Sequence, residues 1–333
     1  MDAVLLRTHG GPDRLVVERV PDPRPGPGET LVRVRARAVE PGLDVKTRRD
    51  AAGWPVALPH VLGTCSVGEI VEGPAAGGLV AVAPSITCGE CPACLAGRDD
   101  TCARRTFMGV HRWGGYAELL TAPTRNLLPL PTDADPGAVA SALVTFPTAW
   151  NMVVTRAAVQ PGETVLVFGA TGAVGVAAAQ IARHRGARVL LAGRDPDRLA
   201  RAAVLTGADV LPPGGPVPSD VDLVVDTVGA ATWPTGLAAL RPGGRLTCCG
   251  GASGDEVTLS LRSLYRRNIS LHLTSGGSAA ELRTVLRLVG GGELAPAVGG
   301  VLPWRAAAEA HRAQESGHPL GRLVLADDER TRA

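Results

Sequence analysis

Four of the seven cysteines of the chain lie within fifteen residues of one another. They follow the spacing Cys-x2-Cys-x2-Cys-x7-Cys and are Cys88, Cys91, Cys94 and Cys102. Four soft thiolates on a short loop form a closed tetrahedral zinc site, which leaves no coordination position for a substrate. An iron–sulfur run would have a shorter last gap followed by proline, and a secreted disulfide scaffold would be a shorter chain with more cysteine. We therefore expect one structural zinc and a reducing, cytoplasmic compartment.

A glycine-rich segment is the second feature that indicates chemistry. Residues 164–168 predict a short apolar strand, and residues 173–185 have helical spacing. Between them the chain has the pattern G-x-x-G-x-x-G, formed by Gly169, Ala170, Thr171, Gly172, Ala173, Val174 and Gly175. The glycines permit a tight turn and a close approach of the backbone to a pyrophosphate, and the helix N-terminus offers free N–H groups. This strand–loop–helix order predicts a dinucleotide site.

The end of the next expected strand, residues 187–192, indicates which dinucleotide is bound. NAD sites place an Asp or Glu there, which accepts hydrogen bonds from the ribose 2′-hydroxyl. This chain has Gly193 and Arg194 instead, which leave room for a 2′-phosphate and offer a bidentate partner for it. Asp195 comes too late and is expected to begin the next helix. We therefore expect NADPH, with a solvated loop charge as the alternative for Arg194.

The elements that position these two sites fall into two groups, and the length of 333 residues suggests two domains. Residues 1–122 are rich in Pro and Gly and contain short β-type runs, of which residues 31–39 alternate polar and apolar side chains. From about residue 145, strands alternate with helices, which predicts βαβ units and a doubly wound parallel sheet. The expected fold is therefore α/β, with a mainly β half.

The charge and hydropathy of the chain exclude other classes of protein. The formal net charge of +2 is too small to predict a nucleic-acid or membrane-surface partner. No apolar run has the length of about 18 residues that a membrane span needs, and the first residues do not have the pattern of a secretory signal. We therefore expect a small-molecule substrate, without a nucleic-acid or membrane partner.

Several motifs occur in an order that resembles the medium-chain dehydrogenase/reductase superfamily. They surround the cysteine loop and the dinucleotide loop and are residues 20–23, 59–63, 113–118, 161–167 and 321–325. The resemblance implies a GroES-like catalytic domain formed by residues 1–140 and 277–333. It also implies a Rossmann NADP-binding domain at residues 141–276, and a homodimer or homotetramer.

The zinc alcohol dehydrogenases of this superfamily bind a second, catalytic zinc through Cys, His and Cys or Glu. At the positions that match these ligands, the chain has Glu40 in place of the first, Thr64 in place of the second, and Val144 just before a helix expected at Pro147. The resemblance therefore implies that the catalytic zinc is absent. A metal site rebuilt from Glu40 and Cys65 is the alternative.

Loss of a Lewis acid favours a reaction in which the developing charge spreads. Reduction of an enone, an enoyl compound or a quinone fulfils this condition. The negative charge moves to the oxygen at the far end of the conjugated system, where hydrogen-bond donors alone can stabilise it. Zinc-free branches of the superfamily use NADPH in such reactions. The alternatives are an alcohol dehydrogenase or ketone reductase without catalytic zinc, and a non-catalytic NADPH-binding protein.

Further residues are assigned roles by the same resemblance. Lys46 is expected to supply the proton, in the string that contains Asp44, and Thr64 to offer a hydroxyl to the substrate oxygen. Thr148 and Arg322 match positions that contact the cofactor. Each of the four has an alternative interpretation. Lys46 would then be a surface lysine and Thr64 a plain turn residue. Thr148 would be a helix N-cap and Arg322 a solvated charge.

Overall fold

The computed structural model describes residues 1–317 and 319–327, which form two compact units. Unit 1 comprises Met1–Val144 and the described residues from Val298 onward, and unit 2 comprises Thr145–Ala297. The boundary between Val144 and Thr145 falls inside helix α3 (Pro136–Trp150). The α/β class that the sequence predicts is confirmed, because one unit is mainly β and the other contains a parallel sheet with helices.

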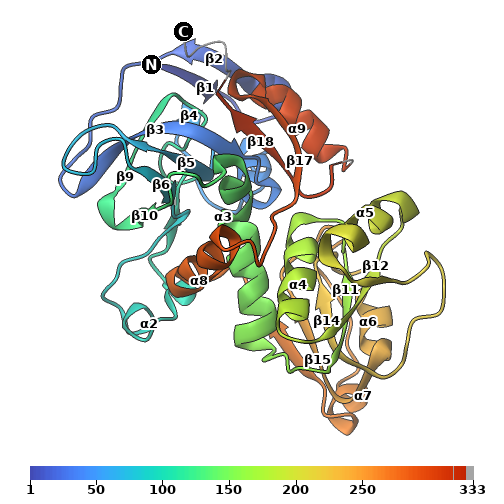
Figure 1. The fold of residues 1–333 in the computed structure, drawn as a ribbon. Helices are drawn as coiled ribbons and strands as arrows, with labels where there is room; N and C mark the ends of the chain where they lie inside the picture. Colours follow the sequence, from blue (N-terminus) through green and yellow to red (C-terminus); the bar gives the residue numbers. More distant parts are fainter. Residues whose placement is uncertain (318, 328–333) are drawn as a thin grey trace. The chain divides into compact units, whose positions relative to one another are not determined.

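Unit 1 is built on a seven-stranded sheet with the order β10-β6-β5-β3-β18-β17, in which β9 also pairs with β3 (Figure 1). A three-stranded sheet has the order β2-β1-β4, and a two-stranded sheet joins β7 to β8. The strands are β1 (Asp2–Leu6), β2 (Leu15–Arg19), β3 (Glu29–Ala38), β4 (His60–Val61), β5 (Cys65–Ile70), β6 (Leu79–Val82), β7 (Ser85–Ile86), β8 (Thr106–Phe107), β9 (Leu119–Pro123), β10 (Leu127–Pro129), β17 (Val298–Pro303) and β18 (Arg322–Ala326).

Short helices connect these strands, and buried apolar side chains of this unit form two core clusters. The helical elements are η1 (Pro12–Arg14), η2 (Pro41–Val45), α1 (Lys46–Arg48), α2 (Pro92–Leu95), η3 (Asp99–Thr101), η4 (Thr124–Asn126), η6 (Trp304–Ala306) and α9 (Ala307–Glu315). Of these, η2 has π-helical geometry. It leads directly into α1, whose first residue is Lys46.

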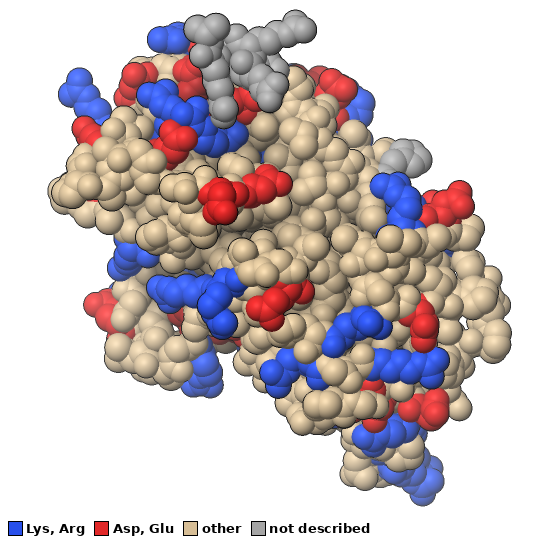
Figure 2. Space-filling model, viewed as in Figure 1, with Lys and Arg blue, Asp and Glu red and all other residues tan. Residues whose placement is uncertain are grey.

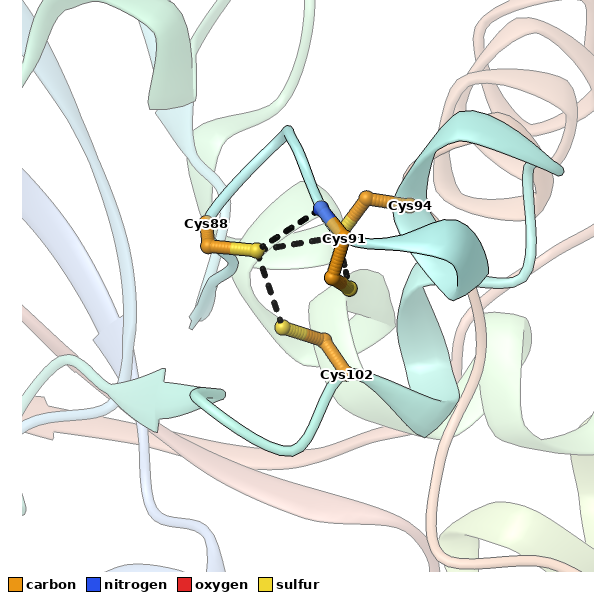
Figure 3. A group of neighbouring side chains, drawn as sticks. All are labelled: Cys88, Cys91, Cys94 and Cys102. Atoms are coloured by element: carbon orange, nitrogen blue, oxygen red, sulfur yellow. Dashed lines mark hydrogen bonds between the residues drawn. The ribbon is translucent and has the colours of Figure 1, made fainter.

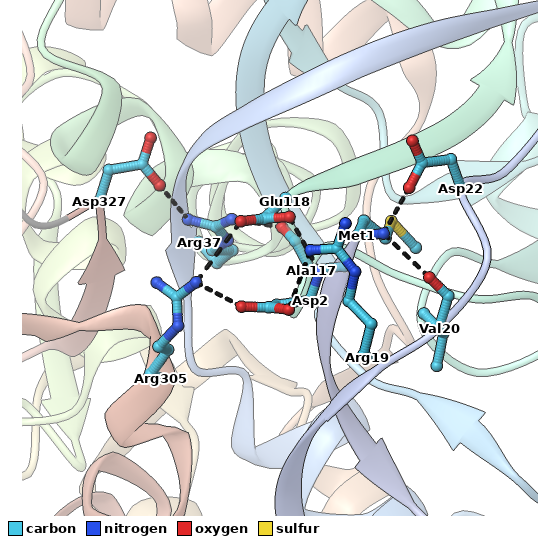
Figure 4. A network of polar contacts seen from close by, with 10 residues as sticks. All are labelled: Met1, Asp2, Arg19, Val20, Asp22, Arg37, Ala117, Glu118, Arg305 and Asp327. Carbon is cyan, nitrogen blue, oxygen red and sulfur yellow. Dashed lines mark hydrogen bonds and ion pairs between the residues drawn. The ribbon is translucent and has the colours of Figure 1, made fainter. Parts of the chain in front are cut away.

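The C-terminal segment of unit 1 returns to the N-terminal strands and is held there by polar contacts (Figure 4). Strand β18 pairs antiparallel with β3. The fully buried Arg37 forms an ion pair with Asp327 at 3.2 Å and donates to the carbonyl of Gly115 at 2.6 Å. Arg305 forms an ion pair with Asp2 at 2.7 Å. These contacts join segments that are about 300 residues apart in the sequence into one unit.

Unit 2 contains a six-stranded parallel sheet with the order β13-β12-β11-β14-β15-β16. Counted along the chain, this is the strand order of a doubly wound dinucleotide-binding sheet. The strands are β11 (Thr164–Phe168), β12 (Arg188–Ala192), β13 (Asp209–Val210), β14 (Val221–Asp226), β15 (Leu240–Cys248) and β16 (Ser270–Leu273). The helical elements are η5 (Asn151–Arg156), α4 (Ala173–His184), α5 (Pro196–Thr206), α6 (Trp233–Ala239), α7 (Leu261–Arg266) and α8 (Ala279–Gly290).

Helix α8 belongs to unit 2, whereas the sequence analysis assigns residues 277–297 to the catalytic domain. Two contacts within unit 2 give the reason. The Glu281 side chain in α8 accepts from Asn151 in η5 at 3.1 Å, and Gln180 in α4 exchanges two hydrogen bonds with the backbone of Ala295. Unit 2 therefore extends to Ala297 rather than to residue 276.

Helix α3 also differs from the expectation that a helix begins at Pro147. It begins at Pro136 and contains Pro147 in its interior, and the π-helical segment η5 follows it directly. Residues 136–156 have the length and hydropathy of a membrane span, but 72% of the apolar window is buried inside the protein. This segment is therefore a core helix, which accounts for its apolar composition.

The exposed charges of the two units are mixed in sign. On the face drawn in Figure 2, basic and acidic side chains lie near one another rather than gathering by sign. The mixture on this face is in keeping with the formal net charge of only +2.

Candidate functional site

The four cysteines of the predicted zinc loop converge in unit 1 (Figure 3). Their sulfur atoms all lie within 4.8 Å of one another. Three of the distances are 3.7 Å between Cys88 and Cys94, 3.5 Å between Cys91 and Cys94, and 3.6 Å between Cys102 and Cys88. A tetrahedral zinc with Zn–S bonds of about 2.3 Å separates its sulfurs by about 3.8 Å. The arrangement therefore fits a zinc ion closed by four thiolates.

The loop geometry favours the thiolate form of the first cysteine, whereas burial and the neighbouring sulfurs raise the pKa of Cys94 to about 11. Cys91 is the N-cap of the short helix α2, and Cys102 directly follows η3. The backbone amides of Glu90 and Cys91 lower the pKa of Cys88 to about 6. Gly89 adopts a φ of +78°, which turns the chain between the first two cysteines. A thiol with a lowered pKa is readily deprotonated, which assists metal binding.

The glycine loop of unit 2 follows β11 and leads into α4, as the sequence predicts. Gly169 has a φ of +72°, and a Cβ atom there would lie 2.2 Å from Thr227 Oγ1. A Cβ atom on Gly175 would lie 2.3 Å from the carbonyl oxygen of Gly169. Gly172 is the N-cap of α4 and provides no side-chain cap for the free N–H groups of this twelve-residue helix. The close turn and the open helix N-terminus fit the pyrophosphate of a dinucleotide.

Arg194 and Asp195 connect β12 to α5, and Asp195 begins that helix as the sequence predicts. Arg194 is exposed. Asp195 is the N-cap of α5 and accepts from the Arg198 backbone amide at 3.0 Å. The guanidinium of Arg198 lies at the glycine loop, with Nη2 at 3.5 Å from the carbonyl oxygen of Thr171. The sequence analysis missed Arg198, although its place in the first turn of α5 was a signal for proximity to this loop.

The positions that match catalytic-zinc ligands in relatives hold other groups in unit 1. Glu40 is buried, and its carboxylate forms an ion pair with Arg322 at 2.9 Å. Cys65 is also buried, and burial raises the pKa of its thiol well above the ordinary value. Among residues 1–317 and 319–327, the four-cysteine group is the only set of three or more Cys, His, Asp or Glu whose ligand atoms lie close enough to hold a metal.

Thr64 is buried in unit 1, where it is hydrogen-bonded to Asp44. Asp44 is fully buried and accepts from Thr64 Oγ1 at 2.7 Å, from the Thr64 amide at 3.0 Å and from the Glu40 amide at 2.9 Å. Burial raises the pKa of Asp44 to about 6. Lys46, two residues later, is exposed in unit 1.

Two further buried side chains extend this cluster and were missed by the sequence analysis. The Tyr116 hydroxyl lies 3.5 Å from Asp44 Oδ2 and 3.0 Å from His311 Nε2. Burial lowers the pKa of His311 to about 3, so its ring is neutral. Because these residues are about 70 and 195 positions apart, no local spacing could have indicated their contact.

Of the residues expected to contact the cofactor, Thr148 and Arg322 lie in different units. Thr148 is buried in the last turn of α3, which excludes the helix N-cap that was its alternative interpretation. Arg322 is at the start of β18, and its side chain is 11% exposed because it pairs with Glu40. The pairing also excludes the interpretation of Arg322 as a solvated charge.

The comparisons with known proteins agree with this arrangement. The family of alcohol dehydrogenase GroES-like domains matches residues 26–132, and the family of zinc-binding dehydrogenases matches residues 206–325. The acryloyl-coenzyme A reductase of Metallosphaera sedula is 28% identical and covers 98% of this chain and 99% of that enzyme. The L-galactonate-5-dehydrogenase of Escherichia coli K12 is 36% identical, but the match covers 61% of this chain and only 59% of that enzyme.

A crystal structure of an NAD-dependent alcohol dehydrogenase has a TM-score of 0.91 and 39% sequence identity. The similarity covers 98% of this chain and all of that chain. Three findings thus lead to the same assignment. They are the strand order of unit 2, the match to the GroES-like domain family, and the similarity to this dehydrogenase over nearly the whole chain. The chain belongs to the medium-chain dehydrogenase/reductase superfamily, among the oxidoreductases that resemble zinc-type alcohol dehydrogenases.

Proposed function

We propose that the protein is an NADPH-dependent reductase of activated C=C bonds, in enones or enoyl compounds, or of quinones, and that it works without a catalytic zinc. The ion pair between Glu40 and Arg322 is the observation that carries the proposal. A guanidinium at 2.9 Å neutralises the one carboxylate among the matched ligand positions. Thr64 donates its hydroxyl to Asp44, and Val144 has no ligand atom in its side chain.

The reaction class follows from the missing Lewis acid. Without a metal, a conjugated acceptor is favoured, because the charge that develops spreads over several atoms. The full-length relative named acryloyl-coenzyme A reductase supports an enoyl substrate. The bound nicotinamide would supply the hydride.

The residues of this chain would then bind the cofactor and deliver the proton. The backbone of the Gly169–Gly175 loop and the α4 N-terminus would hold the pyrophosphate. Arg194 would pair with the 2′-phosphate, and Thr148 and Arg322 would contact other parts of the cofactor. The enolate or phenolate left after hydride addition takes up one proton, which we assign to Lys46 Nζ. We also assign the four-cysteine site to one structural zinc.

Product analysis tests the reaction. With NADPH and an α,β-unsaturated ketone, we expect the saturated ketone at a rate well above the blank without enzyme. The Lys46→Met and Lys46→Arg variants should both lose turnover while they keep NADPH affinity. An allylic alcohol as the main product would contradict the C=C reductase. It would support the second candidate, a metal-free alcohol dehydrogenase or ketone reductase, which the 39% identity to an alcohol dehydrogenase favours.

Dissociation constants test the cofactor assignment. The wild type should bind NADPH more tightly than NADH by about 1–3 kcal/mol, because an arginine–phosphate pair contributes roughly this much. Arg194→Ala should remove most of that preference. Arg201→Ala, which removes an exposed arginine of the following helix α5, is the matched control and should leave the preference unchanged. An unchanged preference in Arg194→Ala would remove Arg194 from the site.

We also propose a homodimer or homotetramer in the reducing cytoplasm. Strand β16 is an edge of the sheet in unit 2, and its Leu273 is 62% exposed. An open edge with an exposed apolar side chain is suited to pairing with a second copy. Sedimentation of the full chain at micromolar concentration should therefore give at least twice the monomer mass, and a monomer would contradict the proposal.

A further inference from the structure

A buried carboxylate in unit 2 holds one end of the loop at residues 274–278, which follows β16. Glu281 is only 8% exposed, and it accepts hydrogen bonds from several donors. The Asn151 amide donates to both of its oxygens at 3.1 and 3.2 Å, and the Ser278 backbone amide donates at 2.6 Å. The Thr155 hydroxyl is a further donor. Glu281 thus fixes the C-terminal end of the loop to the helical segment η5.

The same asparagine holds the other end of the loop. Asn151 is 2% exposed, and its Oδ1 accepts from Thr274 Oγ1 at 2.7 Å. Within the loop, Gly277 packs so closely that a Cβ atom would lie 2.4 Å from the carbonyl oxygen of Pro147. The segment η5 is π-helical, a geometry that is frequent at functional sites. Asn151 and Glu281 therefore fix both ends of a loop that contains two glycines.

The topology of the sheet places this loop on the ligand-binding edge. Strands β11, β14, β15 and β16 are parallel, so their carboxyl ends lie at one edge, together with the Gly169–Gly175 loop. Doubly wound sheets bind their ligands outside this edge. The Arg194 position follows β12, on one side of β11, and the loop at residues 274–278 follows β16, on the other side.

We propose that Asn151 and Glu281 are positioning residues, which hold the loop at residues 274–278 as a wall for the nicotinamide half of the cofactor. The inference rests on the proposed binding of NADPH. The adenosine half lies toward β12, where Arg194 would receive its 2′-phosphate. The other half of the dinucleotide therefore extends toward β14, β15 and β16. Because the loop contains Gly276 and Gly277, it needs the buried network to hold a single conformation.

Two ligands separate this role from a purely structural one. NADPH has both halves, whereas 2′,5′-ADP has only the adenosine half with its 2′-phosphate. In Glu281→Gln, the new amide group would place N–H groups against the Asn151 amide and the Ser278 backbone amide, which are themselves donors. In Asn151→Ala, the hydrogen bond that Asn151 accepts from the Thr274 hydroxyl is lost. We expect each variant of the full chain to bind NADPH about tenfold more weakly, a loss typical of one or two buried hydrogen bonds. Its affinity for 2′,5′-ADP should stay within about twofold of the wild type.

Thr284→Ala is the matched control, because Thr284 lies on the same helix α8 and its hydroxyl bonds only the exposed Ala280 carbonyl. It should leave both affinities unchanged. Equal weakening of both ligands in Glu281→Gln and Asn151→Ala would overturn the inference, as would unchanged NADPH affinity. If the wild type prefers NADH, the proposed cofactor choice fails. NADH and AMP then test the network by the same comparison.

Discussion

Two positions of unit 1 match metal sites of zinc-dependent relatives, and they have opposite outcomes in this chain. In the cysteine loop, four thiols converge with sulfur–sulfur distances of 3.5–3.7 Å. At the other position, the polar groups already bind one another. Glu40 pairs with Arg322, and Thr64 donates to Asp44. The second position thus contains polar atoms but no set of free ligands.

We infer from the difference that ligand geometry and local charge decide together whether a metal binds. A thiolate cluster carries negative charge that a cation stabilises, and its ligands have no other strong partner. At the Glu40 position an internal guanidinium already neutralises the carboxylate, so a dication would have to displace Arg322. Each of the following predictions concerns a change at one of these two positions.

The largest effect is expected from the cysteine loop. Cys91→Ser should lose the zinc and lower the unfolding temperature by about 10 °C or more, because a structural zinc stabilises the fold directly. Differential scanning calorimetry with parallel metal analysis measures both changes. Cys249→Ser, outside the cluster, is the control and should keep the zinc and most of the stability. A Cys91→Ser protein with an unchanged unfolding temperature would show that the loop does not depend on a metal.

A smaller loss is expected when the ion pair at the other position is broken. Arg322→Ala leaves Glu40 buried and unpaired, which should reduce the free energy of unfolding by about 3–5 kcal/mol. The double variant Glu40→Gln/Arg322→Met should recover much of this loss in urea unfolding. Arg7→Ala removes an exposed pair with Glu18 and should leave the stability nearly unchanged, because solvent screens such a pair. If Arg322→Ala behaves like this control, Arg322 does not neutralise a buried charge.

The smallest effect concerns the pH dependence of the same cluster. Burial raises the pKa of Asp44 from 3.8 to about 6, so the folded protein binds this proton more tightly than the unfolded chain. The contribution to stability is fully present below about pH 4 and is lost as the pH rises through 6. Between pH 4 and 7, wild-type stability should therefore fall relative to Asp44→Asn by up to about 3 kcal/mol. Unfolding titrations at several pH values measure this difference, and parallel pH profiles would contradict it.

How well the sequence predicts the structure follows from the distance between interacting residues. The cysteine loop and the glycine loop are local, so spacing alone was enough to predict which residues come together. The pair of Glu40 with Arg322 joins residues 282 positions apart, and Tyr116 meets His311 over 195 positions. No pattern along the chain encodes such contacts, since they arise only when β18 and α9 pack into unit 1.

The boundary errors have a similar origin. Residues 279–290 have a helical pattern that is visible in the sequence, but their assignment to unit 2 depends on the buried contact of Glu281 with Asn151. Pro147 predicts a helix start from local rules. The actual helix begins at Pro136 and accommodates Pro147 just before the π-helical segment η5. Local sequence propensity therefore predicted most helices and strands. Tertiary contacts determined where these elements begin and end and to which domain they belong.

The number of zinc ions per chain tests the central contrast most directly. Elemental analysis of the full chain, purified without chelators, should give one zinc per chain, held by Cys88, Cys91, Cys94 and Cys102. The Glu40→Ala variant should keep the same ratio. Two zinc ions per wild-type chain, reduced to one by Glu40→Ala, would show that the Glu40 position binds a metal after all, and would contradict the account.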